Sequence, residues 1–390
     1  MSGSEGFPQI PLFDLQLEPE DLEAVAQALR SGWLAPGPRT EAFERAFAEH
    51  LGCAHGVAVS SCTAALHLAY LAAGVGPGDE VIVPSITFAA TAAAVVYAGG
   101  TPVFADIIGP EDPSLDPQDV AGRITPRTKA VGVVHMAGYP APVRELRALC
   151  DEHGLALIED VAHAPDAAVD GRRLGTFGLA GAFSFFSNKV LSVGEGGLLA
   201  TDDDRVAALA RRLRDHALSS SAWERSQATE PAGYDVSELG FNYRWDEPRA
   251  ALLLSRMGRL ERDVARRREL SLAYRRALAD VPGVVLPYTD DAVMRSSCYV
   301  MPIVLEDLDK QGPLRIALRE RHGVQTSLLY PSVHEFTAYR ERWPGISLPH
   351  SERWSRTEVT IPLFPHMTEE QQGRVVAAIR TELAALDGGA

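Results

Sequence analysis

Two stretches of the chain decide the fold class: residues 155–164 read LALIEDVAHA, and residues 183–197 read FSFFSNKVLSVGEGG. Each stretch begins as a short apolar run and then turns polar or glycine-rich, which is typical of a buried strand followed by a turn. Asp160 ends the first run, and Lys189 follows the second. We therefore expect two strands that deliver a carboxylate and an amine to the same edge of a sheet.

The same pattern continues outward from these stretches, because short β-branched runs alternate with helical patterns along most of the chain. The other strand-like runs are GVAVSS (56–61), EVIVPS (80–85), TPVFAD (101–106) and KAVGVVHMAG (129–138). Strands that alternate with crossover helices predict an α/β fold with a mainly parallel central sheet, covered by helices on both faces.

The character of the chain changes near residue 250. Residues 251–280 form a long amphipathic helical pattern rich in arginine, which we interpret as the solvated face of a connecting helix rather than a nucleic-acid surface. The runs CYVMPIVL (298–305) and PLRIALRERHG (313–323) follow, and a terminal helix begins at Thr368. We predict a large domain over residues 1–250, including an N-terminal segment, and a smaller C-terminal α+β domain over residues 251–390.

Composition and charge exclude several classes of function. The 390 residues include 37 Lys and Arg against 52 Asp and Glu, so the net charge is −15. Such a chain has no general attraction for nucleic acid or an anionic membrane surface, and it holds no apolar run long enough to span a bilayer. The four cysteines lack C-x-x-C spacing, so we expect no metal site, no disulfides and a cytoplasmic location.

Lys189 and Asp160 match what pyridoxal 5′-phosphate (PLP) requires. Its aldehyde needs a lysine, its pyridine nitrogen needs a carboxylate, and its phosphate needs backbone N–H groups, best at a helix N-terminus. The segment SCTAALHL (61–68) offers such a helix start at Cys62 and Thr63. Each residue also has a plainer interpretation: a surface lysine, a carboxylate at a solvated strand end, or a hydroxyl that only caps a helix.

Several motifs in a fixed order then carry a resemblance to a known family. They are SCTAALHL (61–68), GPGDEVIVPSITF (76–88), TPVF (101–104), TPRTKAV (125–131), EDVAHA (159–164), FSFFSNK (183–189), GEGG (194–197) and GFNYR (240–244). In this order the chain resembles the DegT/StrS-type aminotransferases from about Gly32 to the C-terminal helix. The resemblance implies a fold type I PLP-dependent transferase that acts on a nucleotide-linked keto-sugar.

The resemblance also implies a role for individual residues. Lys189 would hold PLP as a Schiff base and shuttle the proton, and Asp160 would pair with the pyridine nitrogen. The remaining cofactor contacts would be Cys62, Thr63 and Ser184 at the phosphate, Phe88 and Ala162 on the two ring faces, His163 near the ring hydroxyl, and Asn242 at the phosphate of a neighbouring subunit. Asn242 in that role implies a homodimer with shared active sites. His135 is left open as either a site residue or a strand-end histidine.

The chain departs from the family pattern at places that concern the substrate more than the cofactor. Cys62 stands where the family has glycine, and Ala35 stands where a hydroxyl residue is frequent. The segment Leu329-Tyr330-Pro331, followed by His334, replaces a familiar His-Tyr-Pro. We therefore expect Trp33, Tyr330 and His334 to contact the substrate.

The function that the resemblance implies is transfer of an amino group from glutamate or glutamine to a keto-sugar, in antibiotic or polysaccharide biosynthesis. The alternatives are amination of a cyclitol ketone and an activity like that of 3-amino-5-hydroxybenzoate synthase. A non-catalytic PLP-fold protein that serves as a regulator or scaffold would be expected to lose Lys189 or Asp160, and both are present.

Overall fold

The structure is a computed structural model that describes residues 9–229 and 233–388. A seven-stranded sheet forms its centre, and a smaller three-stranded sheet lies in the C-terminal part. The strands of the large sheet, in spatial order, are β1 (His55–Val59), β11 (Gly197–Thr201), β10 (Ala180–Ser184), β7 (Ala156–Asp160), β6 (Thr128–Val134), β2 (Glu80–Pro84) and β3 (Thr101–Ala105). The strands of the small sheet are β12 (Val284–Val285), β13 (Met301–Leu305) and β14 (Glu358–Ile361).

Two hairpin-like pairs complete the strands, namely β4 (Ile107–Gly109) with β5 (Asp112–Leu115) and β8 (Ala168–Val169) with β9 (Arg172–Arg173). The helices of the first half are α1 (Pro19–Arg30), α2 (Pro38–Leu51), α3 (Cys62–Ala72), α4 (Ala90–Tyr97), α5 (Pro117–Arg123), α6 (Val143–His153), α7 (Asp204–Leu213) and α8 (Ala222–Gln227). Those that follow are α9 (Glu247–Met257), α10 (Leu260–Leu278), α11 (Asp290–Arg295), α12 (Gln311–His322), α13 (Thr337–Arg340), α14 (Pro349–Thr357) and α15 (Glu369–Gly388). Short 3₁₀ turns lie at Met136–Gly138 and Val333–Glu335.

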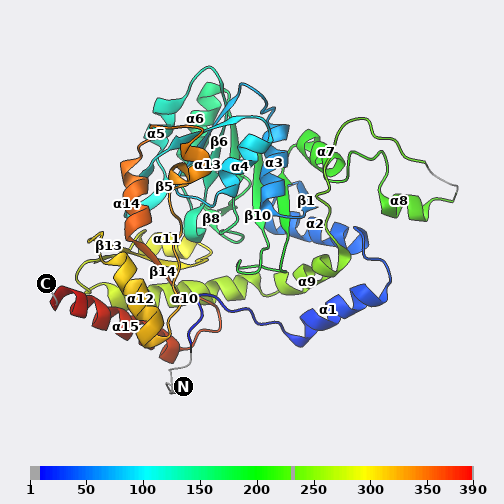
Figure 1. Ribbon diagram of the computed structural model, residues 1–390. Helices are drawn as coiled ribbons and strands as arrows, with labels where there is room; N and C mark the ends of the chain where they lie inside the picture. The colour runs from blue at the N-terminus through cyan, green and yellow to red at the C-terminus, as the bar shows by residue number, and fades with distance from the viewer. Residues whose placement is uncertain (1–8, 230–232, 389–390) are drawn as a thin grey trace.

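The large sheet is mainly parallel, as the sequence predicts. Strands β10, β7, β6, β2 and β3 run parallel, and only β11 is reversed against both of its neighbours. Helices cover both faces of the sheet (Figure 1). Successive strand residues alternate between two apolar cores: Val57 and Val59 pack with α3 and α7, whereas Ala58 packs on the opposite side with Phe43 and Phe47 of α2. The fold class expected from the sequence is therefore confirmed.

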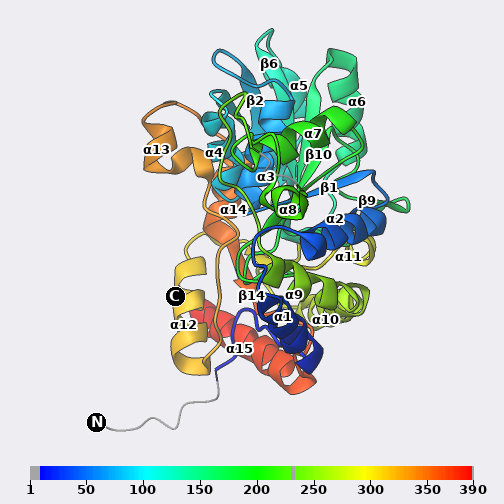
Figure 2. The ribbon, with the colours of Figure 1, turned by 90° about the vertical axis from the view of Figure 1, so that its right-hand side faces the viewer.

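The C-terminal part lies beneath the sheet, where α12 and α15 pack together and the long α10 crosses (Figures 1 and 2). The N-terminal segment also packs in this part of the molecule, because the backbone of Ile10 forms a parallel β-bridge with Val324 next to α12. Residues 333–348 instead return to the large sheet, where Val333 donates its N–H to Ser85 O. Helix α9 runs through residue 250, so the division into domains at that residue stays a prediction.

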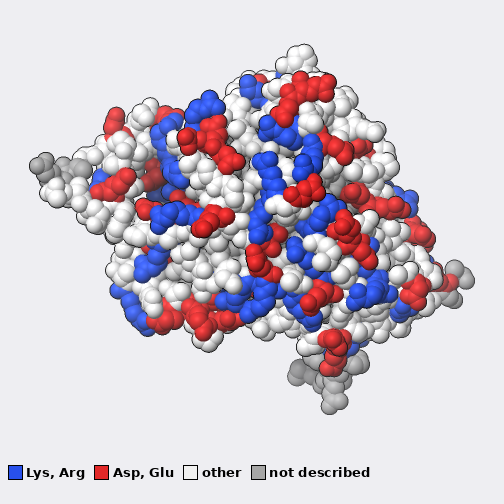
Figure 3. All heavy atoms as spheres, turned by 180° about the vertical axis from the view of Figure 1, so that it is seen from behind, with Lys and Arg blue, Asp and Glu red and all other residues white. Residues whose placement is uncertain are grey.

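The arginine-rich pattern over residues 251–280 differs from the single solvated helix that we expected. Gly258 separates α9 from α10, and Arg256 and Arg267 are buried rather than solvated. Other arginines of α10 are paired, for example Arg266 with Glu269. On the face shown in Figure 3, basic side chains lie interspersed with acidic ones.

The structure also describes the cysteines and the apolar character of the helices. All four cysteines are free thiols. Within the described ranges, no helix combines the length and the apolar character that a bilayer crossing needs.

A buried glutamate fixes the entry to α2. Glu247, the first residue of α9, accepts hydrogen bonds from the backbone N–H groups of Gly37, Arg39 and Thr40 at 2.8–3.0 Å. These are N–H groups that the first turn of α2 cannot pair internally. The bonds hold α9 against the loop that carries Trp33.

Replacing Glu247 by alanine leaves those buried N–H groups without an acceptor. We expect the free energy of unfolding to fall by about 2–4 kcal/mol, measured by urea denaturation. Glu41→Ala on α2 is the matched control, since Glu41 is exposed and, within residues 9–229 and 233–388, its ion pair is the exposed one with Arg45; it should unfold as the unchanged protein does. Equal stability of the two variants would show that the Glu247 bonds contribute nothing.

Candidate active site

A cavity of about 340 Å³ lies at the carboxyl ends of the parallel strands. We call it the Asp160 cavity. Nine of the site residues expected from the sequence line it, namely Cys62, Thr63, Phe88, Asp160, Ala162, His163, Ser184, Lys189 and Tyr330. The separate segments that carry them therefore meet at one place.

Asp160 ends β7 and is buried, and its carboxylate is held by short bonds. Oδ2 accepts from Thr91 Oγ1 at 2.8 Å, and Oδ1 accepts from the Ala162 N–H at 3.1 Å. Burial raises the pKa of this carboxyl, although these two hydrogen bonds act in the opposite direction. Among the described residues no cationic side chain lies within ion-pair distance of it. A cationic group entering the cavity would complete its pairing.

Glu159, the preceding residue, points to the other side of β7. It accepts from the N–H groups of Gly175 and Gly178 at 2.8 Å, and it lies 3.1 Å from His135 Nε2. His135 is fully buried and does not line the Asp160 cavity. The interpretation of His135 as a strand-end histidine therefore describes its place in the structure.

Lys189 brings an amine to the cavity without a carboxylate partner among the described residues. Its Nζ lies 4.5 Å from the centre of the Tyr299 ring. Burial lowers the pKa of this amine from its ordinary value of 10.5 to about 8, although the nearby Asp160 charge opposes the shift. A lowered pKa makes the uncharged amine available near neutral pH, as a nucleophile or a base requires.

The N-terminus of α3 supplies a place for an anion. Ser61 caps the helix by accepting from the Ala64 N–H at 3.2 Å. The N–H groups of Cys62 and Thr63 find no acceptor within the described parts of the chain, and both residues line the cavity. Unpaired N–H groups at a helix start favour a phosphate.

The structure explains why position 197, in the segment after Lys189, is a glycine. A Cβ at this position would lie 2.3 Å from the carbonyl carbon of Ser61 and 2.5 Å from the Cys62 nitrogen. The glycine therefore lets β11 pass against the start of α3. A side chain is excluded at Gly197 because the close neighbour is the protein's own backbone.

The C-terminal part of the chain contributes Tyr330 to the cavity. Its hydroxyl lies 3.0 Å from His163 Nε2, and its ring lies 5.9 Å from that of Phe88. The preceding residue is fixed on both sides, since Leu329 donates its N–H to Glu358 and its carbonyl accepts from Trp354 Nε1, both at 2.8 Å. Burial raises the pKa of Glu358 to about 8.

His163 is neutral in this setting. Burial, reinforced by the charge of Lys189, holds its pKa well below the ordinary value. Its ring stacks on Tyr299 with centroids 4.4 Å apart, and its Nδ1 has no partner among the described residues.

Three expected site residues lie elsewhere in this chain. Trp33 contacts Trp223 edge-on, with ring centroids 5.1 Å apart. The backbone of Asn242 forms an isolated antiparallel β-bridge with Asp215. His334 is buried, with its Nδ1 2.7 Å from Ser85 Oγ. None of them lines the Asp160 cavity, so their roles stay predictions.

Three residues at the site were not predicted from the sequence. Thr91 bonds Asp160, Thr87 lies 2.7 Å from Thr91 through their hydroxyls, and Tyr299 packs against both His163 and Lys189. The two threonines were visible as hydroxyls beside Phe88 at a helix start, which is a usable signal. Tyr299 lies just before β13 in an apolar run, and nothing in that run indicated a residue at the site.

The residues present fit PLP. The buried Asp160 carboxylate lacks a cationic partner in contact, which a protonated pyridine nitrogen supplies, and the α3 N-terminus has free N–H groups for a phosphate. Lys189 offers an unpaired amine. The structure thus provides a matching group for each polar part of the cofactor.

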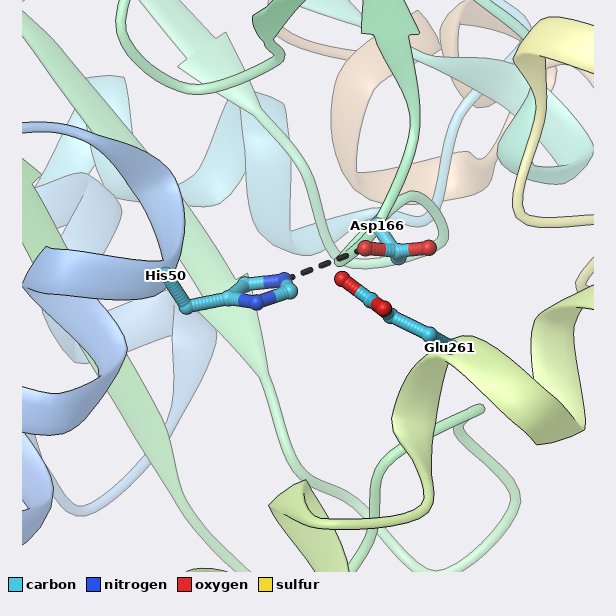
Figure 4. A group of neighbouring side chains, drawn as sticks. All are labelled: His50, Asp166 and Glu261. Atoms are coloured by element: carbon cyan, nitrogen blue, oxygen red, sulfur yellow. Dashed lines mark ion pairs between the residues drawn. The ribbon is translucent and has the colours of Figure 1, made fainter.

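A second group of ionisable side chains lies away from the cavity (Figure 4). His50, Asp166 and Glu261 have ligand atoms close enough to surround a metal ion, with His50 Nε2 3.1 Å from Asp166 Oδ1. Arg173, however, pairs with both carboxylates, at 3.1 Å for Glu261. Since the single guanidinium bonds both carboxylates, the group ties α2 and α10 to the β8–β9 hairpin.

Comparison with known proteins agrees with this geometry. The model of the DegT/DnrJ/EryC1/StrS aminotransferase family matches residues 15–380. The spore coat polysaccharide biosynthesis protein SpsC of Bacillus subtilis is 36% identical over 368 residues, which cover 93% of this chain and 94% of SpsC.

Two solved structures are similar throughout. The structure of S. venezuelae DesV in complex with a ketimine intermediate is 37% identical, with a TM-score of 0.87 over 96% of this chain and 98% of that one. The structure of DesI in the presence of its TDP-sugar product is 35% identical, with a TM-score of 0.82 over 95% and 92% of the two chains.

The lowered pKa of Lys189 predicts a pH dependence in the cofactor-free protein. Above about pH 8 the amine is uncharged, so its acetylation by acetic anhydride should rise through pH 8 and then level off. Mass spectrometry of the acetylated Lys189 peptide, quantified against an isotope-labelled standard of the same peptide, measures this. A labelling curve that still rises steeply at pH 10 would contradict the shift.

Proposed function

The chain belongs to the DegT/DnrJ/EryC1/StrS aminotransferase family, and we propose that it moves an amino group from glutamate or glutamine to the ketone of a nucleotide-linked keto-sugar. The family makes the protein a PLP-dependent aminotransferase. The observation that carries the proposal is the unpaired Lys189 amine, which opens into the same cavity as the buried Asp160 carboxylate.

Asp160 and Lys189 would have separate roles in the reaction. Bound PLP supplies an aldehyde carbon that exchanges amino groups and a ring that takes up the electrons of a broken C–H bond. Asp160 would hold the ring nitrogen of PLP and so would keep that ring electron-poor. Lys189 Nζ would take the proton from the carbon that bears the donor amino group and would later release it. Its pKa of about 8 suits a base that must both accept and release a proton.

The cavity walls support a controlled proton transfer. Phe88, Ala162 and Tyr330 line the cavity beside the two polar groups with mainly apolar atoms. His163 is neutral, so it bonds the Tyr330 hydroxyl without adding a charge next to Lys189.

The relatives support a sugar as the acceptor. SpsC is named for spore coat polysaccharide biosynthesis, and DesI was solved with its TDP-sugar product. We extend that substrate class to this chain as part of the proposal. The cytoplasmic location expected from the sequence remains a prediction.

We also propose that two copies share their active sites. The segment between α7 and α9 leaves the body of the protein as an extended arm that carries α8 (Figure 1), and Asn242 lies at its base, where its backbone forms a β-bridge with Asp215. Leu239 on this arm is 92% exposed, and Phe88 at the cavity mouth is 61% exposed, so apolar area at both places is available to a partner. Light scattering should give the mass of a dimer, and a monomer would contradict shared sites.

The proposed reaction is tested with a panel of acceptors. We expect the purified holoenzyme, given glutamate or glutamine, to convert at least one TDP- or UDP-linked keto-sugar to the amino-sugar, detected by mass spectrometry. Lys189→Ala should lower the rate by a factor of about 10²–10⁴, the usual contribution of a general base, or more.

The same panel includes a cyclitol ketone. Turnover of that ketone alone would replace the nucleotide-sugar assignment while keeping the transamination. A Lys189→Ala protein that still formed product at the original rate would overturn the mechanism itself.

A further inference from the structure

A second cavity of about 520 Å³ lies on the other side of the Lys189 segment. Asn188 and Lys189 line both this cavity and the Asp160 cavity, so the two spaces share a wall. We call it the arginine cavity, because five arginines of α9, α10 and the turn between them line it together with residues of the N-terminal segment. These arginines are Arg256, Arg259, Arg262, Arg266 and Arg267.

Most of the charges around the arginine cavity cancel in pairs. Its four carboxylates are all engaged: Glu18 with Arg259 and Arg262, Asp263 with Arg262, Glu269 with Arg266, and Asp14 with His366. Arg259 also pairs with Asp21, at 2.6 Å. No carboxylate of this lining lies within ion-pair distance of the remaining cations, although Asp21 and Asp263 attract Arg256 at longer range.

Three cations stay without a carboxylate partner among the described residues: Arg256, Arg267 and Lys189. Arg256 is only 7% exposed, and its Nη1 donates to Ser192 Oγ at 3.4 Å. Its Nε has no partner within the described chain. Burial lowers the pKa of Arg256, and the guanidinium nonetheless stays protonated near neutral pH.

Arg267 differs from Arg256 in what holds it. It is 4% exposed, and its Nη1 donates to the carbonyls of Cys298, Tyr299 and Leu363 at 3.0–3.4 Å. Those carbonyls fix the side chain without neutralising it. A buried cation without a counter-charge is costly, and an anion in the adjoining space removes that cost.

We propose that the arginine cavity binds an oxyanion of a substrate, a phosphate or a carboxylate, with Arg256 as its principal cation. An oxyanion held there lies beside the Lys189 segment while the cofactor fills the Asp160 cavity. The identity of the oxyanion rests on the proposed function, in which a nucleotide diphosphate and a dicarboxylic amino donor are the two sources. The binding itself does not require turnover.

The test uses holoenzyme saturated with PLP, so that the α3 N-terminus is already filled. Inorganic pyrophosphate is titrated at constant ionic strength and followed by calorimetry. We expect saturable binding that is at least about ten-fold weaker in Arg256→Gln, a loss typical of one charge-assisted contact. Arg144→Gln is the control, since Arg144 is exposed, pairs with Asp170 and lies outside the cavity.

A second variant keeps the test decisive if Arg256→Gln does not fold. Ser192→Asp places a carboxylate next to Arg256 and so supplies the missing counter-charge from within. We expect it to raise the melting temperature and to abolish pyrophosphate binding. Absence of saturable binding to the unchanged protein, or equal binding by the unchanged protein and both variants, would overturn the proposal.

Competition identifies the source of the oxyanion. Displacement of pyrophosphate by thymidine diphosphate assigns the cavity to the nucleotide, and displacement by 2-oxoglutarate assigns it to the amino donor. If neither displaces it, the assignment to a substrate is overturned. If the keto-sugar panel gives no product while pyrophosphate still binds, the proposed function fails and the anion site stands.

Discussion

The site depends on one constraint, a carboxylate that is buried at the end of a parallel strand. Water cannot solvate Asp160, so its charge must be met by hydrogen bonds and by a cation. Thr91 and the Ala162 N–H provide the bonds, and no cationic side chain among the described residues provides the contact. Lys189 stands nearby with a lowered pKa and remains unpaired. Both groups line the Asp160 cavity, where PLP would bind.

The sheet explains why these groups meet. Parallel strands β7 and β10 end at the same edge, so Asp160 and the segment after Ser184 arrive together. The period of two along β7 sends Glu159 to the opposite side, where it binds the Gly175 and Gly178 N–H groups and holds the β8–β9 region. Two adjacent acidic residues thus serve different ends, one structural and one facing the cavity. The reversed strand β11 needs Gly197 to pass the start of α3.

The strands and several site residues could be predicted from short stretches of sequence. Apolar runs and their polar ends identify the strands, and a Ser-Cys-Thr start identifies a helix that faces a ligand, because these signals lie within a few residues. The contact of Thr91 with Asp160 was not predictable in the same way, since it joins residues 69 positions apart. Arginine-rich composition suggested a solvated face, but whether a given arginine faces inward depends on packing, and Arg256 and Arg267 do. Gly258 ends α9 where the helical pattern alone runs on.

The most direct test of the account uses the small number of lysines. The chain has only three, Lys129, Lys189 and Lys310. Reduction of the purified holoenzyme with borohydride, followed by peptide mapping, shows which amine carries the cofactor. The account predicts the mass of the reduced pyridoxyl phosphate group on the Lys189 peptide alone, with none in the Lys189→Ala protein. Label on Lys129 or Lys310, or no label on a protein that still transaminates, would contradict it.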